Sequence, residues 1–376
     1  MLKTYIQEHT PQLLQLLRDL CAIPAPSHHE ECRAVFCQQW LTDAGCQGVY
    51  IDEAKNVIYP LNCENSREIT VVVAHTDTVF PDMDAVEYQE DDLCIRCPGV
   101  GDDTANLANM MLAAKFFTEK GLKPKNGILF VCNSCEEGLG NLKGTRAIME
   151  QYGGRVKQFL SLDAAIGTMY DRCVGSHRYQ VELRTQGGHS FSAFGNKNAL
   201  AALAELIHAI YSITPPKKPG TKTTYNVGIV EGGTSVNTIA QQASMLCEYR
   251  SDDVDCLAFM EQAFAELFAK AQTDEVSVRV DKIGDRPCAS VDPEKQERLA
   301  SLCETVMSSV TGKPTTRKSA STDCNIPLSL GIPAVCIGTM TGEGAHTREE
   351  YVHKATMPLG LEITIRTLLA MTDTEI

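Results

Sequence analysis

Side chains that can bind divalent metal ions follow several short apolar runs of this 376-residue sequence. They occur in the stretches "VVVAHTDT", "PGVGDDTAN", "FVCNSCEEG", "FLSLDAA" and "GEGAHTREE". The residues concerned are His75, Asp77, Asp102, Asp103, Glu136, Glu137, Asp163 and His346. Ligands of α/β proteins bind at the carboxyl ends of the strands, so we expect these side chains at one edge of a sheet. Two imidazoles and several carboxylates there would suit one or two divalent cations.

The spacing within two of these stretches predicts a division of roles. His75 and Asp77 are two residues apart, so on an extended segment they point the same way. Asp77 could then hold the ring of a metal-binding His75 in the tautomer that ligation requires. Glu136 and Glu137 are adjacent and cannot both point the same way along a strand. One of them can therefore act as a base while the other binds metal.

Two Cys-x-x-Cys pairs offer a competing chemistry. Thirty-four residues separate the pair Cys94 and Cys97 from the pair Cys132 and Cys135, and four thiolates can hold a structural zinc ion. That separation is longer than zinc-ribbon spacing, and the 16 cysteines are spread through a large chain. We therefore expect reduced cysteines that fill buried positions. A redox or structural-zinc protein built on these pairs is the alternative.

Composition narrows the range of partners and locations. The 34 basic and 48 acidic residues give a net charge of −14, and no Lys/Arg run could track a phosphate backbone, so nucleic acid is not an expected partner. No apolar run approaches the roughly 18 residues that span a bilayer. The N-terminus has the pattern of an amphipathic helix without a cleavage site. We expect a soluble, cytoplasmic protein without a membrane partner.

The elements that must position these residues change in character along the chain. The β-branched runs "EITVVVAH" and "NGILFVCNS" flank the helical stretch "NLANMMLAAKFFTEKG", which indicates a parallel strand–helix–strand unit. From about Gly175 the strands alternate apolar and polar residues, with two helical stretches among them. That alternation is typical of an antiparallel sheet with one exposed face.

The pattern of short buried strands and helices returns after Asp285, so we predict that the chain holds one domain inserted into another. A new helix begins where Asp292 and Pro293 suit the N-cap and the first helical position. At this length two domains are expected, since single cores stop growing near about 250 to 300 residues. The predicted fold class is α/β with an inserted α+β domain. The predicted boundaries are 1–174 and 286–376 for the outer domain and 175–285 for the insert.

These motifs, in this order, resemble the M20 family of di-metal peptidases and deacylases. They are "AHTD", "PGVGDDTAN", "CEEGLGNLKG", "SLDAA", "GGHSFSAFGNKNA", "STDCNIPLSLGIPAV" and "GAHTREEYV". The resemblance covers nearly the whole length, and the chain looks most similar to the peptidase T-like branch. It implies a zinc-peptidase-like catalytic domain with a mixed sheet flanked by helices. It also implies that the insert is a ferredoxin-like domain that serves as lid and dimerisation surface.

The resemblance implies a metal-binding role for five residues. His75 and Asp163 would bind one metal ion, Glu137 and His346 would bind the other, and Asp102 would bridge both. Two divalent ions are implied, with zinc expected and manganese or cobalt as alternatives.

The resemblance also implies the catalytic residues. Glu136 would be the general base that takes a proton from a metal-bridging water and passes one to the leaving amine. Asp77 would orient His75, and the peptide bond between Asp102 and Asp103 is expected to be cis.

Three further residues would act from the inserted domain. His189 would stabilise the oxyanion in the active site of the opposite subunit of a homodimer. Asn237 and Arg250 would contact the substrate, and Arg250 would bind its carboxylate. The alternatives are a polar turn residue at His189 and a surface ion-pair partner at Arg250.

The function that the resemblance implies is metal-dependent hydrolysis of an amide bond in small peptides, of the aminopeptidase or di- or tripeptidase type. Asp163 supports this, because Asp rather than Glu at that position accompanies such peptidases in the family. Thr104 and Ala105 depart from the family's Lys and Gly, so the surroundings of Asp102 are expected to differ. An N-acyl-amino-acid deacylase of the same family is the alternative. A catalytically silent binding protein would have lost a ligand or the base, and none is missing from the sequence.

Overall fold

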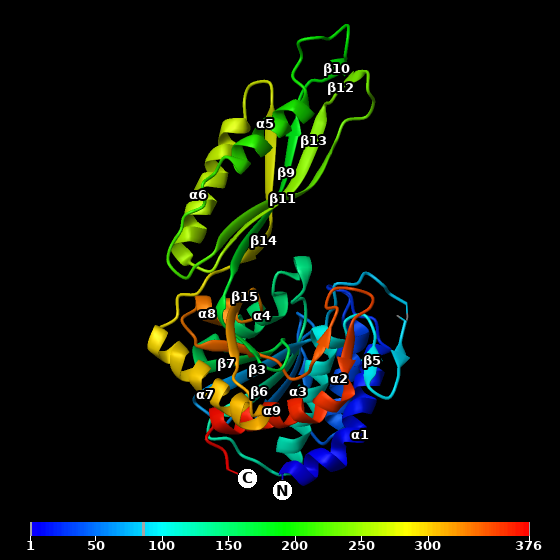
Figure 1. The fold of residues 1–376 in the computed structure, drawn as a ribbon, viewed down its shortest axis with the longest axis vertical. Helices are drawn as coiled ribbons and strands as arrows, with labels where there is room; N and C mark the ends of the chain where they lie inside the picture. Colours follow the sequence, from blue (N-terminus) through cyan, green and yellow to red (C-terminus); the bar gives the residue numbers. More distant parts are fainter. Residues whose placement is uncertain (1, 85–86, 376) are drawn as a thin grey trace. The chain divides into compact units, whose positions relative to one another are not determined.

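The computed structural model describes residues 2–84 and 87–375. The chain divides into two compact units, which are Met1–Cys173 with Ser290–Ile376 and, between them in sequence, Val174–Ala289 (Figure 1). Among the described residues, no helix has both the length and the apolar character needed to cross a membrane. Each unit has a core of its own.

The first unit is built on a mixed eight-stranded sheet. Its strands, in spatial order, are β1 (Tyr50–Ile51), β2 (Val57–Leu61), β6 (Gly127–Asn133), β3 (Ile69–His75), β7 (Val156–Leu162), β16 (Ala334–Ile337), β8 (Thr168–Cys173) and β15 (Thr316–Ala320). The central strands β6, β3, β7 and β16 run parallel. Every residue of β3 and β6 is buried, as expected for parallel strands covered on both faces.

Helices flank this sheet, which confirms the predicted α/β fold class. They are α1 (Leu2–Cys21), α2 (Glu31–Asp43), α3 (Ala105–Glu119), α4 (Lys143–Tyr152), α7 (Pro293–Thr311), α8 (Asn325–Ser329) and α9 (Met357–Met371). The α3 helix is buried on almost all sides because it packs against both the sheet and α9. As predicted, Asp292 caps α7, and its side chain accepts the N–H of Glu294 at 2.9 Å.

A small second sheet joins segments that are far apart in sequence. Its order is β17 (Gly342–Glu343), β18 (Tyr351–His353), β5 (Cys94–Arg96) and β4 (Gln89–Glu90). Short helical turns span Val100–Thr104, Gly138–Gly140, Gly153–Arg155 and Lys354–Thr356. Because β5 pairs with β18, the segment after β5 and the segment before β18 are held side by side. Each of these two segments carries a predicted metal ligand.

The second unit is an antiparallel sheet with two helices. The sheet order is β11 (Thr223–Gly232), β13 (Gln242–Ser251), β9 (Gly175–Arg184) and β14 (Ser277–Arg286). The helices are α5 (Ala199–Tyr211) and α6 (Val254–Ala271), and a two-stranded ribbon is formed by β10 (Gly188–His189) and β12 (Thr238–Ile239). Asn198 and Asp253 cap the two helices with their side chains.

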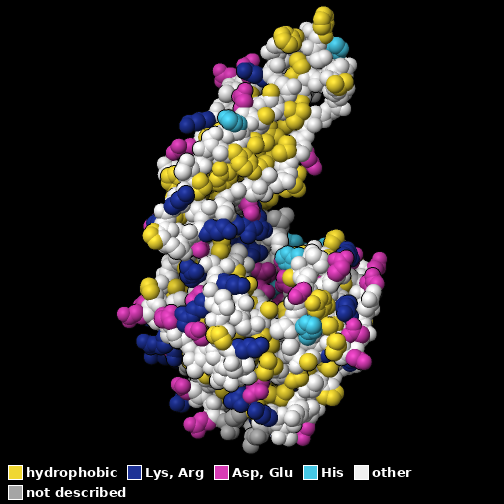
Figure 2. Space-filling view, in the orientation of Figure 1, with side chains coloured by type: hydrophobic (Ala, Val, Ile, Leu, Met, Phe, Trp, Pro, Cys, Tyr) yellow, Lys and Arg dark blue, Asp and Glu magenta, His cyan; other side chains and the backbone are white. Residues whose placement is uncertain are grey.

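Large apolar side chains are exposed on the second unit. Phe191 and Phe194, which follow β10, are 88% and 89% exposed, and Ile229 and Val230 are exposed on the edge strand β11. Figure 2 shows a band of hydrophobic side chains along the visible face of this unit, and more at the end that carries β10 and β12. Contiguous apolar surface of this kind marks an interaction site more often than a free surface.

Candidate metal centre

The predicted ligands of the first unit meet at the carboxyl ends of its parallel strands. His75 is the last residue of β3, and Asp163 directly follows β7. Glu136 and Glu137 lie just beyond the end of β6. Asp102 and His346 come from the two segments that the small sheet holds together, and their side chains point at the same cluster. The sequence predicted all six residues at one sheet edge, and the first four do follow strands of one parallel sheet.

Asp102 lies between the two histidines. Its Oδ1 atom is 3.1 Å from Nε2 of His75, and its Oδ2 atom is 3.1 Å from Nε2 of His346. His346 Nε2 is also 3.0 Å from Oε1 of Glu137, and His75 Nε2 is 4.0 Å from Oδ1 of Asp163. Among the described residues, two groups of possible ligands share Asp102, and a third joins His75 with Glu136 and Glu137. Within each group the ligand atoms lie no more than 4.8 Å apart.

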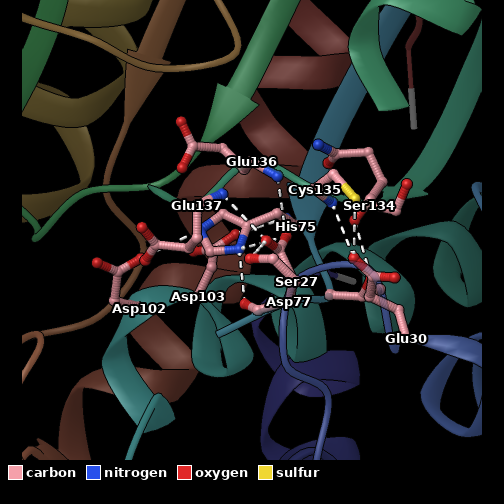
Figure 3. A network of polar contacts seen from close by, with 12 residues as sticks. Ser27, Glu30, His75, Asp77, Asp102, Asp103, Ser134, Cys135, Glu136 and Glu137 are labelled. Carbon is pink, nitrogen blue, oxygen red and sulfur yellow. Dashed lines mark hydrogen bonds and ion pairs between the residues drawn. The ribbon is translucent and has the colours of Figure 1, made fainter. Parts of the chain in front are cut away.

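Asp77 holds His75 and the glutamate pair in place. The Nδ1 atom of His75 lies 3.0 Å from the main-chain oxygen of Asp77 and 3.5 Å from its Oδ1 atom, so Nδ1 carries the proton and Nε2 faces the cluster. The Asp77 carboxylate accepts the N–H groups of Glu136 and Glu137, each at 3.0 Å, and the hydroxyl of Ser27 at 2.6 Å (Figure 3). The contact of Ser27 with Asp77 was not predicted, because nothing in the stretch "IPAPS" indicates a role for this serine.

The backbone before the glutamate pair adopts an unusual conformation. Cys135 has a φ of 56°, in the left-handed region that non-glycine residues seldom adopt. The buried carboxylate of Glu30 accepts its N–H at 3.2 Å and its thiol at 3.1 Å. Glu136 and Glu137 leave the backbone in different directions in Figure 3, as their adjacency predicted. Sequence reasoning missed Glu30, whose partner is 105 residues away.

The carboxylates strongly favour positive charge on both histidines. Burial opposes protonation of His75, but the carboxylates around it, led by Asp103, raise its pKa well above the usual value. Hydrogen bonds to Asp102 and Glu137 raise the pKa of His346 to about 10. A site that stabilises cations this strongly is suited to divalent metal ions, which compete with protons for the same nitrogen and oxygen atoms.

The carboxylates also influence one another. Burial opposes ionisation of Asp102, yet the two histidines lower its pKa. Burial raises the pKa of Asp103 and Asp163, and in both cases the negative charge of Asp102 adds to the effect. So many buried carboxylates in one place require compensating positive charge.

The turn that carries Asp102 is bound on both sides. The Asp102–Asp103 peptide bond is cis, as the family resemblance implied. Asp103 accepts the N–H of His75 at 2.9 Å and the side-chain amide of Asn106 at 2.7 Å. Thr104 is one of the two residues that depart from the family's Lys and Gly, and its hydroxyl donates to the main-chain oxygen of Gly99 at 2.6 Å.

Glu350 supports the same turn and was not predicted. Its carboxylate accepts the N–H groups of Gly99 at 2.7 Å, Gly101 at 2.8 Å and Asp102 at 2.8 Å. Burial, together with the charge of Asp102, raises the pKa of Glu350 to about 7. In the sequence, Glu350 is the second of two adjacent glutamates in "TREEY", and nothing in that stretch distinguishes it from its neighbour.

The two Cys-x-x-Cys pairs are not assembled into a metal site. In the part of the chain that the structure describes, none of the possible metal-binding groups contains a cysteine. Cys94 lies 3.3 Å from Nδ1 of His353, whereas the Cys97 thiol points to the oxygen of Cys21 at 3.8 Å. No disulfide links any of the 16 cysteines, all of which lie within the described residues, and burial raises the pKa of Cys135 to about 12. Fifteen of these cysteines fill buried positions, as expected, whereas Cys32 is exposed.

The remaining predicted residues lie in the second unit. His189 and Asn237 are neighbours there, since His189 pairs with Thr238 and the N–H of Ser190 donates to the oxygen of Asn237 at 2.9 Å. His189 Nδ1 accepts the N–H of Phe191 at 3.2 Å, a turn contact of the kind the alternative interpretation described. Arg250 forms a two-bond ion pair with Glu248, at 2.8 and 3.0 Å.

The fold and the site together are those of an α/β protein with a candidate centre for two divalent ions. The model of the peptidase family M20/M25/M40 matches residues 71–370, so the chain belongs to that family, as its motifs indicated. A fungal protein named "Probable carboxypeptidase", from Ajellomyces capsulatus, is 22% identical over 259 residues. That match covers 62% of this chain and 59% of the relative, so it spans little more than half of the relative's length.

Two solved peptidase structures have the same fold over nearly the whole chain. A tripeptidase from Staphylococcus aureus has a TM-score of 0.77 at 21% identity, covering 96% of this chain and 99% of that one. The aminopeptidase PepT from Bacillus cereus has a TM-score of 0.73 at 20% identity, covering 96% and 98%. The likeness to PepT agrees with the predicted resemblance to the peptidase T-like branch.

Proposed function

We propose that this protein is a two-metal aminopeptidase that cleaves an amide bond in small peptides, of di- or tripeptide size. The observation that carries the proposal is the position of Asp102, whose two oxygens each lie 3.1 Å from a different histidine. A carboxylate placed in this way can bridge two cations. The two structures named aminopeptidase and tripeptidase support the choice of substrate.

The donor set fits two divalent ions. His75 and Asp163 would complete one site and His346 and Glu137 the other, with Asp102 shared between them. One imidazole and carboxylate oxygens at each site suit zinc, and manganese or cobalt are the alternatives. When bound, the ions would supply the Lewis acidity that polarises the scissile carbonyl and lowers the pKa of the attacking water.

Glu136 is the proposed general base. It lies beside the ligands, and Asp77 fixes its backbone N–H. Its carboxylate would take a proton from the attacking water and deliver it to the nitrogen of the leaving amine, so that the proton is transferred within the site. The neighbouring Glu137 is directed to His346 and would serve as a ligand instead.

The second unit is proposed to act as lid and dimerisation surface. His189 and Asn237 lie at the end of the sheet where β13 begins with Gln242, and Arg250 lies near the other end of that strand. Arg250 lies eight positions after Gln242 on this strand, which is about 26 Å at roughly 3.3 Å per residue. A tripeptide is only about 10 Å long.

One copy of the second unit therefore could not place both groups on the same small peptide. If Arg250 binds the substrate carboxylate and His189 stabilises the oxyanion, the two residues must come from different subunits. The exposed apolar side chains beside β10 and on β11 support such a homodimer.

The alternative function is removal of an acyl group from an N-acyl amino acid, which uses the same chemistry on a different substrate. The discriminating experiment offers the zinc- or manganese-loaded protein matched di- and tripeptides with free and with N-acetylated amino termini, and detects products by mass spectrometry. We expect turnover of the free-amine peptides only. Turnover of the acetylated set alone would make the protein a deacylase, and the inference from Asp163 would be wrong.

A further inference from the structure

Glu350 is a buried carboxylate that is bound by backbone rather than by a cation. Its side chain is 1% exposed, and three N–H groups of the turn at 99–102 donate to it at 2.7 to 2.8 Å. Among the described residues, none of the ion pairs includes it. An apolar side chain at this position would leave the three N–H groups without an acceptor, so the carboxylate is needed to hold this turn.

The backbone around Glu350 is shaped to admit its carboxylate. A Cβ atom on Gly101 would come within 2.9 Å of Oε1 of Glu350, so a larger residue there would displace the carboxylate. Gly99 has a φ of 76°, which turns its N–H toward Oε2 and is readily adopted only by glycine. The turn and the carboxylate therefore fit each other closely.

Glu350 also belongs to the segment that carries His346, four residues earlier in the chain. Its N–H donates to the oxygen of Thr347 at 3.4 Å, and its own main-chain oxygen accepts the N–H of Cys97 at 3.2 Å. Through its side chain and its backbone it joins the segment of one histidine to the turn of Asp102, 248 residues away.

We propose that Glu350 is a positioning residue of the metal centre, which fixes the Asp102 carboxylate between His75 and His346 so that it can bridge two ions. This inference rests on the proposed two-metal function. Glu350 would touch neither metal nor substrate, and would act through the three N–H groups that set the direction of the Asp102 side chain. Groups that orient a ligand in this way typically affect metal affinity ten- to a hundred-fold.

The test is a cobalt titration of the full chain after removal of metal. Glu350→Gln keeps the size of the side chain but replaces one acceptor oxygen by an amide that cannot accept an N–H. Glu349→Gln is the matched control, because Glu349 is the exposed neighbour of Glu350 and its replacement by Gln makes the same change of charge. Affinity is read by competition with a chelator, and the geometry of the site by the visible absorption bands of bound Co²⁺.

We expect Glu350→Gln to weaken binding of at least one Co²⁺ ion by about ten- to a hundred-fold and to change the Co²⁺ spectrum. Glu349→Gln should stay within about two-fold of the parent protein. If Glu350→Gln does not fold, Glu350→Asp, which retracts the carboxylate by one methylene, is titrated in the same way. Unchanged affinity and spectrum in a folded Glu350 variant would overturn the inference. Failure of the unmodified protein to bind Co²⁺ would instead overturn the proposed function.

Discussion

Three hydrogen bonds end on the Asp77 carboxylate, and two of them come from the backbone of the glutamate pair. The same residue contacts the outer nitrogen of His75. The position of the proposed base and the orientation of a proposed ligand therefore depend on one buried side chain. Hydrogen bonds between protein groups therefore help to fix the geometry of this part of the site.

The role of Glu136 can be tested separately from that of the ligands. Replacement by Gln keeps the size of the side chain but removes its ability to take a proton, so we predict a loss of kcat of at least about 100-fold. Metal content, measured by elemental analysis, should remain that of the parent protein. Glu150→Gln, on the exposed face of α4, is the control. Substantial residual activity, or loss of bound metal, would show that Glu136 is not the base.

Residues that follow a strand were predictable, and so was the supporting role of Asp77 next to His75, but supporting residues from distant parts of the chain were not. His75, Glu137 and Asp163 were predicted because buried parallel strands are evident from their β-branched runs, and ligand sites lie at their ends. Glu30 and Glu350 accept N–H groups of distant backbone, and Ser27 donates to the distant carboxylate of Asp77. No local sequence pattern indicates such contacts. The side chain of Glu350, for example, acts on residues about 250 positions earlier in the chain.

At the level of elements, periodicity predicted the long helices and the fully buried strands, including α3, β3 and β6. It did not predict β8 or β15, whose residues are mostly half-buried, so that neither strict alternation nor a continuous apolar run appears. The small sheet of β17, β18, β5 and β4 was missed as well, because its strands are only two or three residues long. That sheet nevertheless places Asp102 beside His346.

The α6 helix depends on its cap. The Asp253 side chain accepts the N–H of Cys256 at 2.9 Å, and Asp253→Ala should destabilise the protein by about 1 kcal/mol. The ion pair with Lys218, with the cap bond adding to it, lowers the Asp253 pKa to about 2. A lowered carboxyl pKa stabilises the fold above the unfolded pKa near about 4, and the effect is lost as pH falls toward 2.

The difference between parent and Asp253→Ala should therefore be constant near neutral pH and shrink in acid. Denaturant unfolding at several pH values measures it, and hydrogen exchange of α6 locates it. The matched control is Asp274→Ala, an exposed residue beyond the end of α6. Equal stability of the parent and the Asp253 variant at pH 7 would contradict the assigned cap.

For the whole molecule, the length of β13 implies that His189 and Arg250 reach one substrate from different subunits, and this can be tested by mixing two inactive variants. If His189 serves the active site of the other subunit, Glu136→Gln and His189→Ala homodimers are both inactive, but their mixed dimer has one site with both residues intact. Random subunit exchange makes about half of the dimers mixed, so the mixture should recover about a quarter of parent activity. If His189 instead acted within its own subunit, every site in the mixture would carry a defect and no activity would return. If His189 does serve the other subunit, two defective alleles in one cell should complement each other, although neither encodes a working enzyme.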